Sequence, residues 1–237
     1  MMYVTLLLLL LLIILNVSSM NSNNVTSILN YTKERGILCF GDSLTKGLSP
    51  EKDEWEKYHP YSIQLSRSIN NHFNNVTNVK VVDDGVNGEQ TSRMKHRITL
   101  ILSKTLYDVV IVLGGTNDLG HHRSKDEILN DIYEIHSTIH NFGIKSNRTI
   151  VTFAMTIPPL EWKVDETVRA EVNNALREYV NKNITKTFLI DIDKVLTTTH
   201  TDRKYYCPDN VHFSPEGYDL IGELIFNGLK DNSILLA

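Results

Sequence analysis

Short apolar segments alternate with amphipathic segments along most of this chain, and this alternation constrains the fold more than any other feature. Five segments of four or five residues are largely apolar and mostly rich in β-branched side chains, as expected for strands that are buried on both faces of a parallel sheet. These predicted strands are residues 37–40, 79–82, 109–113, 150–153 and 188–192.

The amphipathic segments show the period of a helix, because apolar residues recur every three or four positions. Ser124 and Glu127 form a capping box before one of them, and Ser214-Pro215 is a cap followed by proline at the first helical position. The predicted helices cover residues 61–73, 94–102, 128–142, 168–179 and 215–225. Five strands and five helices in alternation predict an α/β fold, a doubly wound three-layer α/β/α sandwich around a mainly parallel, flavodoxin-like sheet.

Length and charge fit one globular domain and disfavour nucleic acid as a partner. The chain has 237 residues, of which 41% are hydrophobic, and this size suits a single core. Its net charge is −4 and no basic stripe is present. We see no internal repeat and no long linker, so residues 36–237 are assigned to one domain.

The first residues are interpreted as a targeting segment. Residues 6–15 are an unbroken apolar run, and Val17-Ser18-Ser19 resembles a signal-peptidase site. The run is too short to span a bilayer, so residues 1–19 are predicted to be a secretory signal peptide and residues 20–35 a polar leader. An uncleaved signal anchor stays open, since no Lys or Arg precedes the run.

Two further patterns bear on the compartment. Asn-x-Ser/Thr sequons suggest an N-glycosylated protein that is secreted or resides in the secretory-pathway lumen. The chain has only two cysteines, Cys39 and Cys207, so it is not a disulfide scaffold, although a bridge between them is conceivable. The sequons lie at Asn24, Asn30, Asn75, Asn147 and Asn183.

Polar segments follow several of the predicted strands. The first strand leads into Gly41-Asp42-Ser43-Leu44, and residues 84–91, 114–118 and 209–212 follow later strands. Ligands of doubly wound folds bind beyond the carboxyl ends of the strands, so all four segments are expected at one edge of the sheet.

Residues suited to nucleophilic catalysis occur in these segments. Ser43 would need a base, because a free serine hydroxyl is a poor nucleophile, and His212 is the candidate base. Asp209, three residues earlier, can orient the imidazole. Taken alone, Asp209 could equally cap a local turn, with His212 a surface histidine.

Candidate oxyanion donors lie in the other two segments. The backbone amides of Gly88 and Ser43 and the side-chain amide of Asn117 could face a developing negative charge. Alternatively, Gly88 is a turn residue with positive φ and Asn117 a turn or cap residue.

With these motifs in order, the chain resembles the SGNH hydrolases, also called GDSL-type esterases and lipases, from residue 37 to about residue 229. The matching blocks are Gly41-Asp42-Ser43-Leu44, Gly85-Val86-Asn87-Gly88-Glu89, Gly115-Thr116-Asn117-Asp118 and Asp209-x-x-His212. The resemblance implies a metal-independent serine ester hydrolase without a cofactor. It implies Ser43 as nucleophile, His212 as base, Asp209 as its orienting acid, and Ser43, Gly88 and Asn117 as the oxyanion hole.

Two other functions would need different sequence features. A catalytically silent member of the same fold that binds glycans or lipids would show a broken triad, and a phosphate binder would need a glycine-rich phosphate loop. His59, His121 and His122 lack convincing ligand spacing for zinc and are interpreted as loop histidines. Trp162 is expected at the same edge of the sheet, where it could contact substrate or cover the core, and residues 47–58 are expected to form a loop after the nucleophile turn. The substrate is expected to be a small or soluble acyl ester, such as an acetylated sugar or a lysolipid.

Overall fold

The structure is a computed structural model that describes residues 35–51, 56–74, 78–160, 164–182, 186–196 and 203–235. Among the described helices, none is both long enough and apolar enough to cross a bilayer. The sequon residue Asn147 is described and exposed. Several predictions fall outside the described residues: the signal peptide, the leader up to residue 34, Trp162, and the sequon residues Asn24, Asn30, Asn75 and Asn183.

Five parallel strands form one sheet, in the order β2-β1-β3-β4-β5. The strands are β1 (Arg35–Gly41), β2 (Val79–Gly85), β3 (Val109–Leu113), β4 (Val151–Met155) and β5 (Thr187–Ile190). The chain first moves outward from β1 to β2 and then returns to β3 on the other side of β1. The order of the strands therefore reverses beside β1, which is where doubly wound folds bind their ligands.

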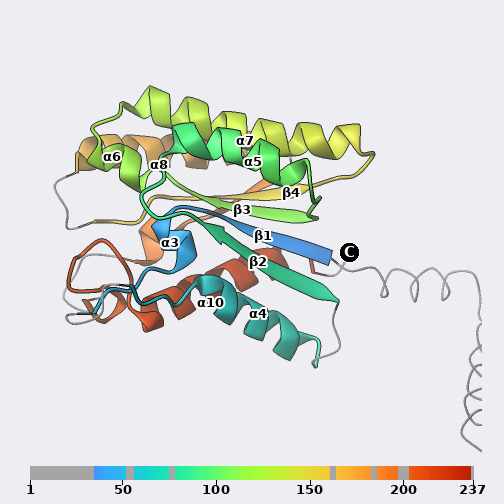
Figure 1. Cartoon of the computed structure of the whole chain (residues 1–237), viewed down its shortest axis with the longest axis horizontal. Coiled ribbons are helices and arrows are strands. Elements are labelled where there is room, and N and C mark those ends of the chain that lie inside the picture. Colours follow the sequence, from blue (N-terminus) through green and yellow to red (C-terminus); the bar gives the residue numbers. More distant parts are fainter. Residues whose placement is uncertain are drawn as a thin grey trace, which may run out of the picture.

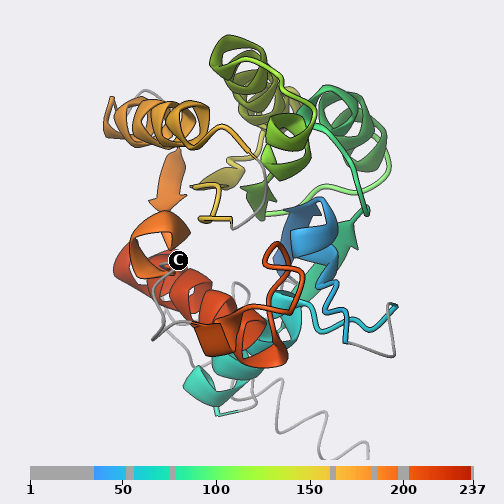
Figure 2. The ribbon, with the colours of Figure 1, turned by 90° about the vertical axis from the view of Figure 1, so that its left-hand side faces the viewer.

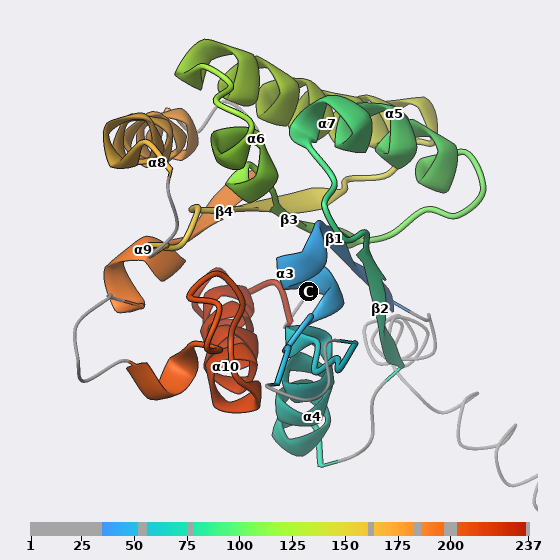
Figure 3. The ribbon, with the colours of Figure 1, turned by 60° about the vertical axis from the view of Figure 1, so that its left-hand side comes forward.

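Helices cover both faces of the sheet (Figures 1 and 3). One face carries α5 (Thr91–Leu102), α7 (Lys125–Lys145) and α8 (Glu166–Asn181), and the other carries α4 (Tyr61–His72) and α10 (Pro215–Asp231). The predicted doubly wound, three-layer α/β/α architecture is thus confirmed, with a sheet that is entirely parallel.

Alternate residues of β1 face the two helical layers, as the two-residue period of a strand requires. Leu38 and Phe40 pack in one buried cluster with Met94 of α5. Ile37, on the other face, packs in a second cluster with Leu65 of α4. Each fully buried apolar side chain contributes roughly 1.5–3 kcal/mol, so a two-sided strand is strongly fixed in place.

The caps predicted from the sequence are present. Ser124 and Glu127 form both hydrogen bonds of a capping box at the start of α7. At the start of α10, the Ser214 hydroxyl accepts a hydrogen bond from the Gly217 amide at 3.2 Å, and Pro215 occupies the first helical position. The beginning of α10 fixes the position of the loop that precedes it.

Several predicted boundaries were wrong. β1 begins at Arg35, inside the segment assigned to the leader, because the Arg35 amide bonds the Asn78 carbonyl at 2.9 Å. β4 spans Val151–Met155 instead of residues 150–153. β5 ends at Ile190 instead of residue 192. The chain leaves the strand at Asp191, which precedes a short helix and whose carboxylate accepts a hydrogen bond from Arg177.

Short helices follow three of the strands and were not predicted. They are α3 (Ser43–Lys46), α6 (Thr116–Gly120) and α9 (Ile192–Val195), and a 3₁₀ turn, η1 (Arg203–Tyr205), precedes α10. Helices of four or five residues are too short to show an apolar period, so the sequence pattern does not reveal them.

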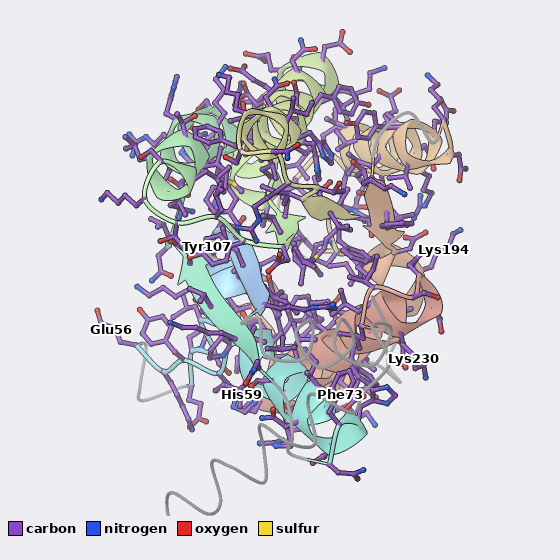
Figure 4. All side chains as sticks on the ribbon, turned by 90° about the vertical axis from the view of Figure 1, so that its right-hand side faces the viewer. Glu56, His59, Phe73, Tyr107, Lys194 and Lys230 are labelled. Atoms are coloured by element: carbon purple, nitrogen blue, oxygen red, sulfur yellow. The ribbon has the colours of Figure 1, made fainter. Side chains whose placement is uncertain are left out.

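Figure 4 views the amino edge of the sheet, opposite the edge where α3 follows β1. Phe73 and Lys230 lie near the ends of α4 and α10 in this view. The His72 ring lies edge-on to Phe73 and to Phe226, with centroids 4.9 and 5.6 Å apart. The contact between His72 and Phe226 joins α4 to α10, the two helices that cover the same face of the sheet.

Candidate active site

All five predicted site residues lie in loops or short helices at the carboxyl edge of the sheet (Figure 2). Ser43 begins α3 directly after β1, Gly88 lies in the turn after β2, and Asn117 lies in α6 after β3. Because β2, β1 and β3 are parallel neighbours, these three segments leave the sheet beside one another. His212 and Asp209 reach the same edge from the loop before α10.

The turn that carries Ser43 is held tightly. The Asp42 carboxylate accepts a hydrogen bond from the Leu44 amide at 2.9 Å and so caps α3. A Cβ atom at position 41 would lie 2.2 Å from Thr45 Oγ1 and 2.3 Å from the Leu113 carbonyl oxygen, so this position needs glycine. Ser43 itself is only 6% exposed. Its hydroxyl is therefore held in one place at the rim of the sheet.

Ser43, His212 and Asp209 form one chain of hydrogen bonds, although Ser43 is 169 residues from His212 in sequence. The Ser43 hydroxyl lies 2.9 Å from His212 Nε2, and His212 Nδ1 lies 2.6 Å from Asp209 Oδ2. The other Asp209 oxygen accepts the backbone amides of Val211 and His212, each at 3.0 Å. Asp209 thus closes its own loop and orients the imidazole at the same time.

The charge of Asp209 decides which imidazole nitrogen carries the proton. Burial raises the pKa of this carboxyl, but the hydrogen bonds from His212 and Val211 outweigh burial and hold the pKa below its usual value. The ionised carboxylate accepts the Nδ1 proton, which leaves Nε2 of a neutral imidazole free to accept the proton of the Ser43 hydroxyl.

The loop that presents His212 is fixed by its ends. The Cys207 amide bonds the His212 carbonyl at 2.8 Å, and Tyr206 pairs with Phe213 in an antiparallel bridge. The Cys207 thiol donates to the Phe213 carbonyl at 3.1 Å. Cys39 and Cys207 are both free and buried, so the conceivable disulfide between them does not form.

Two backbone amides are available as donors. Within the part of the chain that the structure describes, the N–H groups of Ser43 and Gly88 have no hydrogen-bond acceptor. Gly88 has a φ of 72°, and the Glu89 amide closes this turn on the Val86 carbonyl at 3.2 Å. Gly88 is thus a turn residue with positive φ, as the alternative interpretation stated. A turn residue can still donate its backbone N–H, so the two interpretations are compatible.

Asn117 is joined to both neighbouring loops. Its Nδ2 donates to the Glu89 carbonyl at 3.0 Å and to the Asp42 carboxylate at 3.3 Å. An incoming substrate oxygen would have to share or replace the longer of these bonds. Burial raises the pKa of Asp42 to about 7, while the Leu44 amide and His212 oppose this shift.

The aspartate that follows Asn117 has a structural part. Asp118 is fully buried and accepts the Thr91 amide at 3.0 Å and the Thr91 hydroxyl at 2.7 Å. The Arg123 guanidinium bonds the same carboxylate at 2.5 Å. Asp118 thus fixes α6 against the start of α5.

Tyr58, at the end of the predicted loop 47–58, contacts two of the site segments. Its hydroxyl accepts a hydrogen bond from Asn87 Nδ2 at 3.0 Å, and Lys46 Nζ lies 5.0 Å from the centre of its ring. Tyr58 is 38% exposed, and it connects the Ser43 helix with the Gly88 turn. The described parts of the segment 47–58 pair with each other through Leu48 and Tyr58.

The loop histidines are engaged elsewhere. His59 Nε2 lies 2.8 Å from Asp219, and His121 Nδ1 lies 2.7 Å from the Asn117 carbonyl. Within the described ranges no group of three His, Cys, Asp or Glu side chains is arranged to hold a metal ion.

The fold and the hydrogen-bonded serine, histidine and aspartate define an α/β protein with a hydrolase-type site beside β1. A family model described as the GDSL-like lipase/acylhydrolase family matches residues 39–220. The chain therefore belongs to this family, as the sequence motifs predicted, and membership supports an ester hydrolase.

Comparisons of structure agree on the fold. A carbohydrate acetylesterase from Sinorhizobium meliloti is 19% identical with a TM-score of 0.66, covering 84% of this chain and 99% of that one. A family 3 carbohydrate esterase from Clostridium thermocellum is 18% identical with a TM-score of 0.68, covering 86% and 100%. An aryl esterase from M. smegmatis is 18% identical with a TM-score of 0.65, covering 83% and 99%. A search among curated proteins found no match to the sequence.

Proposed function

We propose that this protein is a secreted serine hydrolase that cleaves carboxylic esters through an acyl-enzyme. The observation that carries the proposal is the pair of short contacts at His212, 2.9 Å to the Ser43 hydroxyl and 2.6 Å to the Asp209 carboxylate. Both lie within the range needed for proton transfer and for orientation of the base.

Acylation begins when Ser43 Oγ attacks the ester carbonyl carbon. His212 Nε2 takes the hydroxyl proton, and the Asp209 carboxylate stabilises the imidazolium that forms. The tetrahedral intermediate collapses as the bond between the carbonyl carbon and the alcohol oxygen breaks. His212 then returns its proton to the departing alcohol, which leaves the acyl group on Ser43.

Deacylation repeats these steps with water. His212 removes a proton from a water molecule as the water oxygen attacks the acyl carbon. His212 then protonates Ser43 Oγ as the bond between Oγ and the acyl carbon breaks and the carboxylic acid leaves. Ser43 supplies the nucleophile, His212 transfers the protons and the Asp209 carboxylate orients and stabilises His212, so the proposed mechanism includes no metal and no cofactor. Chelators should leave the activity unchanged.

The oxyanion of both intermediates is proposed to bind the Ser43 amide, the Gly88 amide and Asn117 Nδ2. Support comes from the two backbone N–H groups, which have no acceptor among the described residues, and from their position after neighbouring strands. Donors that are already oriented cost little reorganisation when the negative charge develops, so they favour the transition state over the ester.

For the substrate we propose a small or soluble acyl ester, with acetylated sugars and lysolipids as the classes to test first. Two structures of the same fold are named as carbohydrate esterases, one of them an acetylesterase. Tyr58 offers an exposed ring close to the Ser43 helix, where a sugar or an alkyl chain could pack.

Export and glycosylation are part of the proposal. The apolar run at residues 6–15, followed by Val17-Ser18-Ser19, supports a cleaved signal peptide, and the exposed Asn147 is a suitable glycan acceptor. Expression in a eukaryotic secretory host tests both points. We expect protein in the medium with a new amino terminus near residue 20, and a loss of mass after N-glycosidase treatment. Retention of the full-length chain in the membrane fraction would favour a signal anchor.

The test of activity is hydrolysis of p-nitrophenyl esters from acetyl to palmitoyl, of acetylated sugars and of lysophospholipids. We expect turnover that is highest for short acyl chains and that falls in Ser43→Ala by at least about a thousandfold, since loss of the nucleophile removes the covalent route. If the wild-type protein is as inert as Ser43→Ala on every substrate, the hydrolase proposal fails and a binding function is favoured.

A further inference from the structure

A partly buried ion pair lies next to the Gly88 turn. Glu89 follows Gly88 and is only 6% exposed, and its partner Arg97 projects from α5. Arg97 Nε lies 2.9 Å from both Glu89 carboxylate oxygens, and Nη2 lies 2.6 Å from one of them. Three such contacts fix the carboxylate much more firmly than the single contact of a surface ion pair.

The same guanidinium also bonds the ends of two strands. Arg97 Nη2 donates to the Gly41 carbonyl at 2.9 Å, and Nη1 donates to the Asp84 carbonyl at 3.2 Å and to the Asp84 carboxylate. Its carbon centre lies 4.3 Å from the centre of the Phe40 ring. One side chain thus joins the end of β1, the end of β2 and the turn after β2.

Glu89 connects this arrangement to two of the proposed oxyanion donors. Its amide closes the turn that holds Gly88 with a positive φ, and its carbonyl accepts Asn117 Nδ2 at 3.0 Å. If the Glu89 carbonyl shifts, the Asn117 amide loses the bond that sets its direction. If the Glu89 amide loses its bond to the Val86 carbonyl, the turn that holds Gly88 at a φ of 72° is no longer closed, and the direction of the Gly88 N–H group is no longer fixed.

We infer that Arg97 is a positioning residue for the oxyanion hole, acting through Glu89 on Gly88 and Asn117. This inference rests on the proposed hydrolase function. Arg97 has no hydrogen bond to Ser43, His212 or Asp209 themselves. Its bond to the Gly41 carbonyl reaches the strand end before Ser43, but its contacts with Glu89 lie in the turn of the proposed donors, so we expect its main effect on the stabilisation of charge. Lysine cannot replace it, because the acceptors lie in several directions and match a planar fork of donors.

The alternative is that the Arg97 ion pair only stabilises the fold, and the chain offers a matched control. At the amino edge, Arg148 donates to Asp108 at 2.6 Å, and the same carboxylate accepts the Gly36 amide at 2.9 Å. This pair also joins β1 to a neighbouring segment, but it lies far from the residues of the proposed site. Arg148→Lys therefore shows how much stability and activity the protein loses when a comparable ion pair far from the site is weakened.

The experiment compares Arg97→Lys with Arg148→Lys, using p-nitrophenyl acetate and active-site titration with a fluorophosphonate. For Arg97→Lys we expect kcat per titrated site to fall about 10- to 100-fold, less than the hundredfold or greater loss expected for deleting an oxyanion donor. KM should change less than threefold. The pH at which activity falls on acidification should not move, because the His212–Asp209 pair is untouched. Arg148→Lys should keep the wild-type kcat.

A double-mutant cycle with Asn117→Ala gives a second reading. The effect of Arg97→Lys should shrink in that background, since one of the two donors it positions is already absent. If Arg97→Lys does not fold, Glu89→Gln takes its place, with the same expected loss of kcat. A variant that lowers the melting temperature but keeps kcat within twofold would overturn the inference and leave the hydrolase proposal intact. A wild-type protein without activity would instead refute the hydrolase proposal.

Discussion

The contact between Asp209 and His212 gives the sharpest prediction for substitution at a single site. Asp209→Asn replaces the ionised oxygen that lies 2.6 Å from His212 Nδ1 with a neutral amide group. If the amide nitrogen faces Nδ1, it donates a hydrogen bond there and forces the proton onto Nε2. The imidazole can then no longer accept the Ser43 proton. Asparagine also removes the negative charge that stabilises the imidazolium.

The size of the effect follows from the distance. At 2.6 Å and an effective dielectric constant near 20, the attraction between carboxylate and imidazolium is about 6 kcal/mol. At about 1.36 kcal/mol per factor of ten, this corresponds to a loss of roughly four powers of ten in kcat. Both side chains are partly exposed, with side-chain exposures of 16% and 23%, so screening lowers the expected loss to about 10³- to 10⁴-fold.

The assay is steady-state hydrolysis of a short p-nitrophenyl ester between pH 5 and 9, with thermal unfolding measured in parallel. The chain supplies a second aspartate–histidine pair as the control, since Asp219 lies 2.8 Å from His59 outside the site. Asp219→Asn should keep full activity. A folded Asp209→Asn variant with activity within tenfold of wild type would refute the role given to Asp209. Equal losses in both variants would point to damage to the fold.

Two further predictions concern stability. Burial, reinforced by His140, lowers the pKa of His136 to about 3, so the folded state keeps this imidazole neutral while the unfolded chain takes up a proton near pH 6.5. Its contribution to the free energy of unfolding is therefore complete above pH 6.5 and is lost as the pH falls toward 3, at about 1.4 kcal/mol per pH unit. Urea denaturation of wild type and His136→Leu at pH 7 and pH 5 tests this. The free energy of unfolding should fall more between the two pH values for wild type than for His136→Leu, and equal falls would contradict the prediction. Gly41→Ala should destabilise the fold by at least about 1–3 kcal/mol, because its Cβ meets Thr45 and the Leu113 carbonyl. A Cβ at Gly88 meets no atom within 4 Å, so Gly88→Ala should cost only the strain of a side chain at a φ of 72°, about 1 kcal/mol, and should lower kcat because relief of that strain turns the proposed donor amide. A larger loss of melting temperature in Gly88→Ala than in Gly41→Ala would refute the packing argument.

Much of the fold could be predicted because the pattern that specifies it is local. Each strand had to be apolar on both faces, as Leu38 and Ile37 of β1 are, and each helix had to present one apolar stripe to the sheet. The order of the strands was not predicted, because the local pattern does not say on which side of β1 the chain adds its next strand. Boundaries were less predictable, since β1 begins with an arginine whose backbone, not its side chain, makes the pairing.

The five candidate site residues could be named from the sequence because each follows a strand or precedes a helix cap in a recognisable block; their catalytic roles stay a proposal. Arg97 gave no comparable signal, because it occupies one turn of an ordinary amphipathic helix and its acceptors come from three other segments. The sequence likewise did not indicate that the Arg177 guanidinium bonds the carboxylates of both Asp191 and Asp193 after β5. Such contacts depend on side chains that meet only after folding, so no spacing in the sequence reports them.

Ser43 as the nucleophile is the central claim, and covalent labelling tests it most directly. The protein is treated with one equivalent of a fluorophosphonate, residual ester hydrolysis is measured, and the modified residue is located by peptide mass mapping. We predict that hydrolysis is lost in proportion to a single adduct on Ser43, and that Ser43→Ala takes up no label. Activity that survives complete modification of Ser43, or that is lost with the adduct on another residue, would contradict the account.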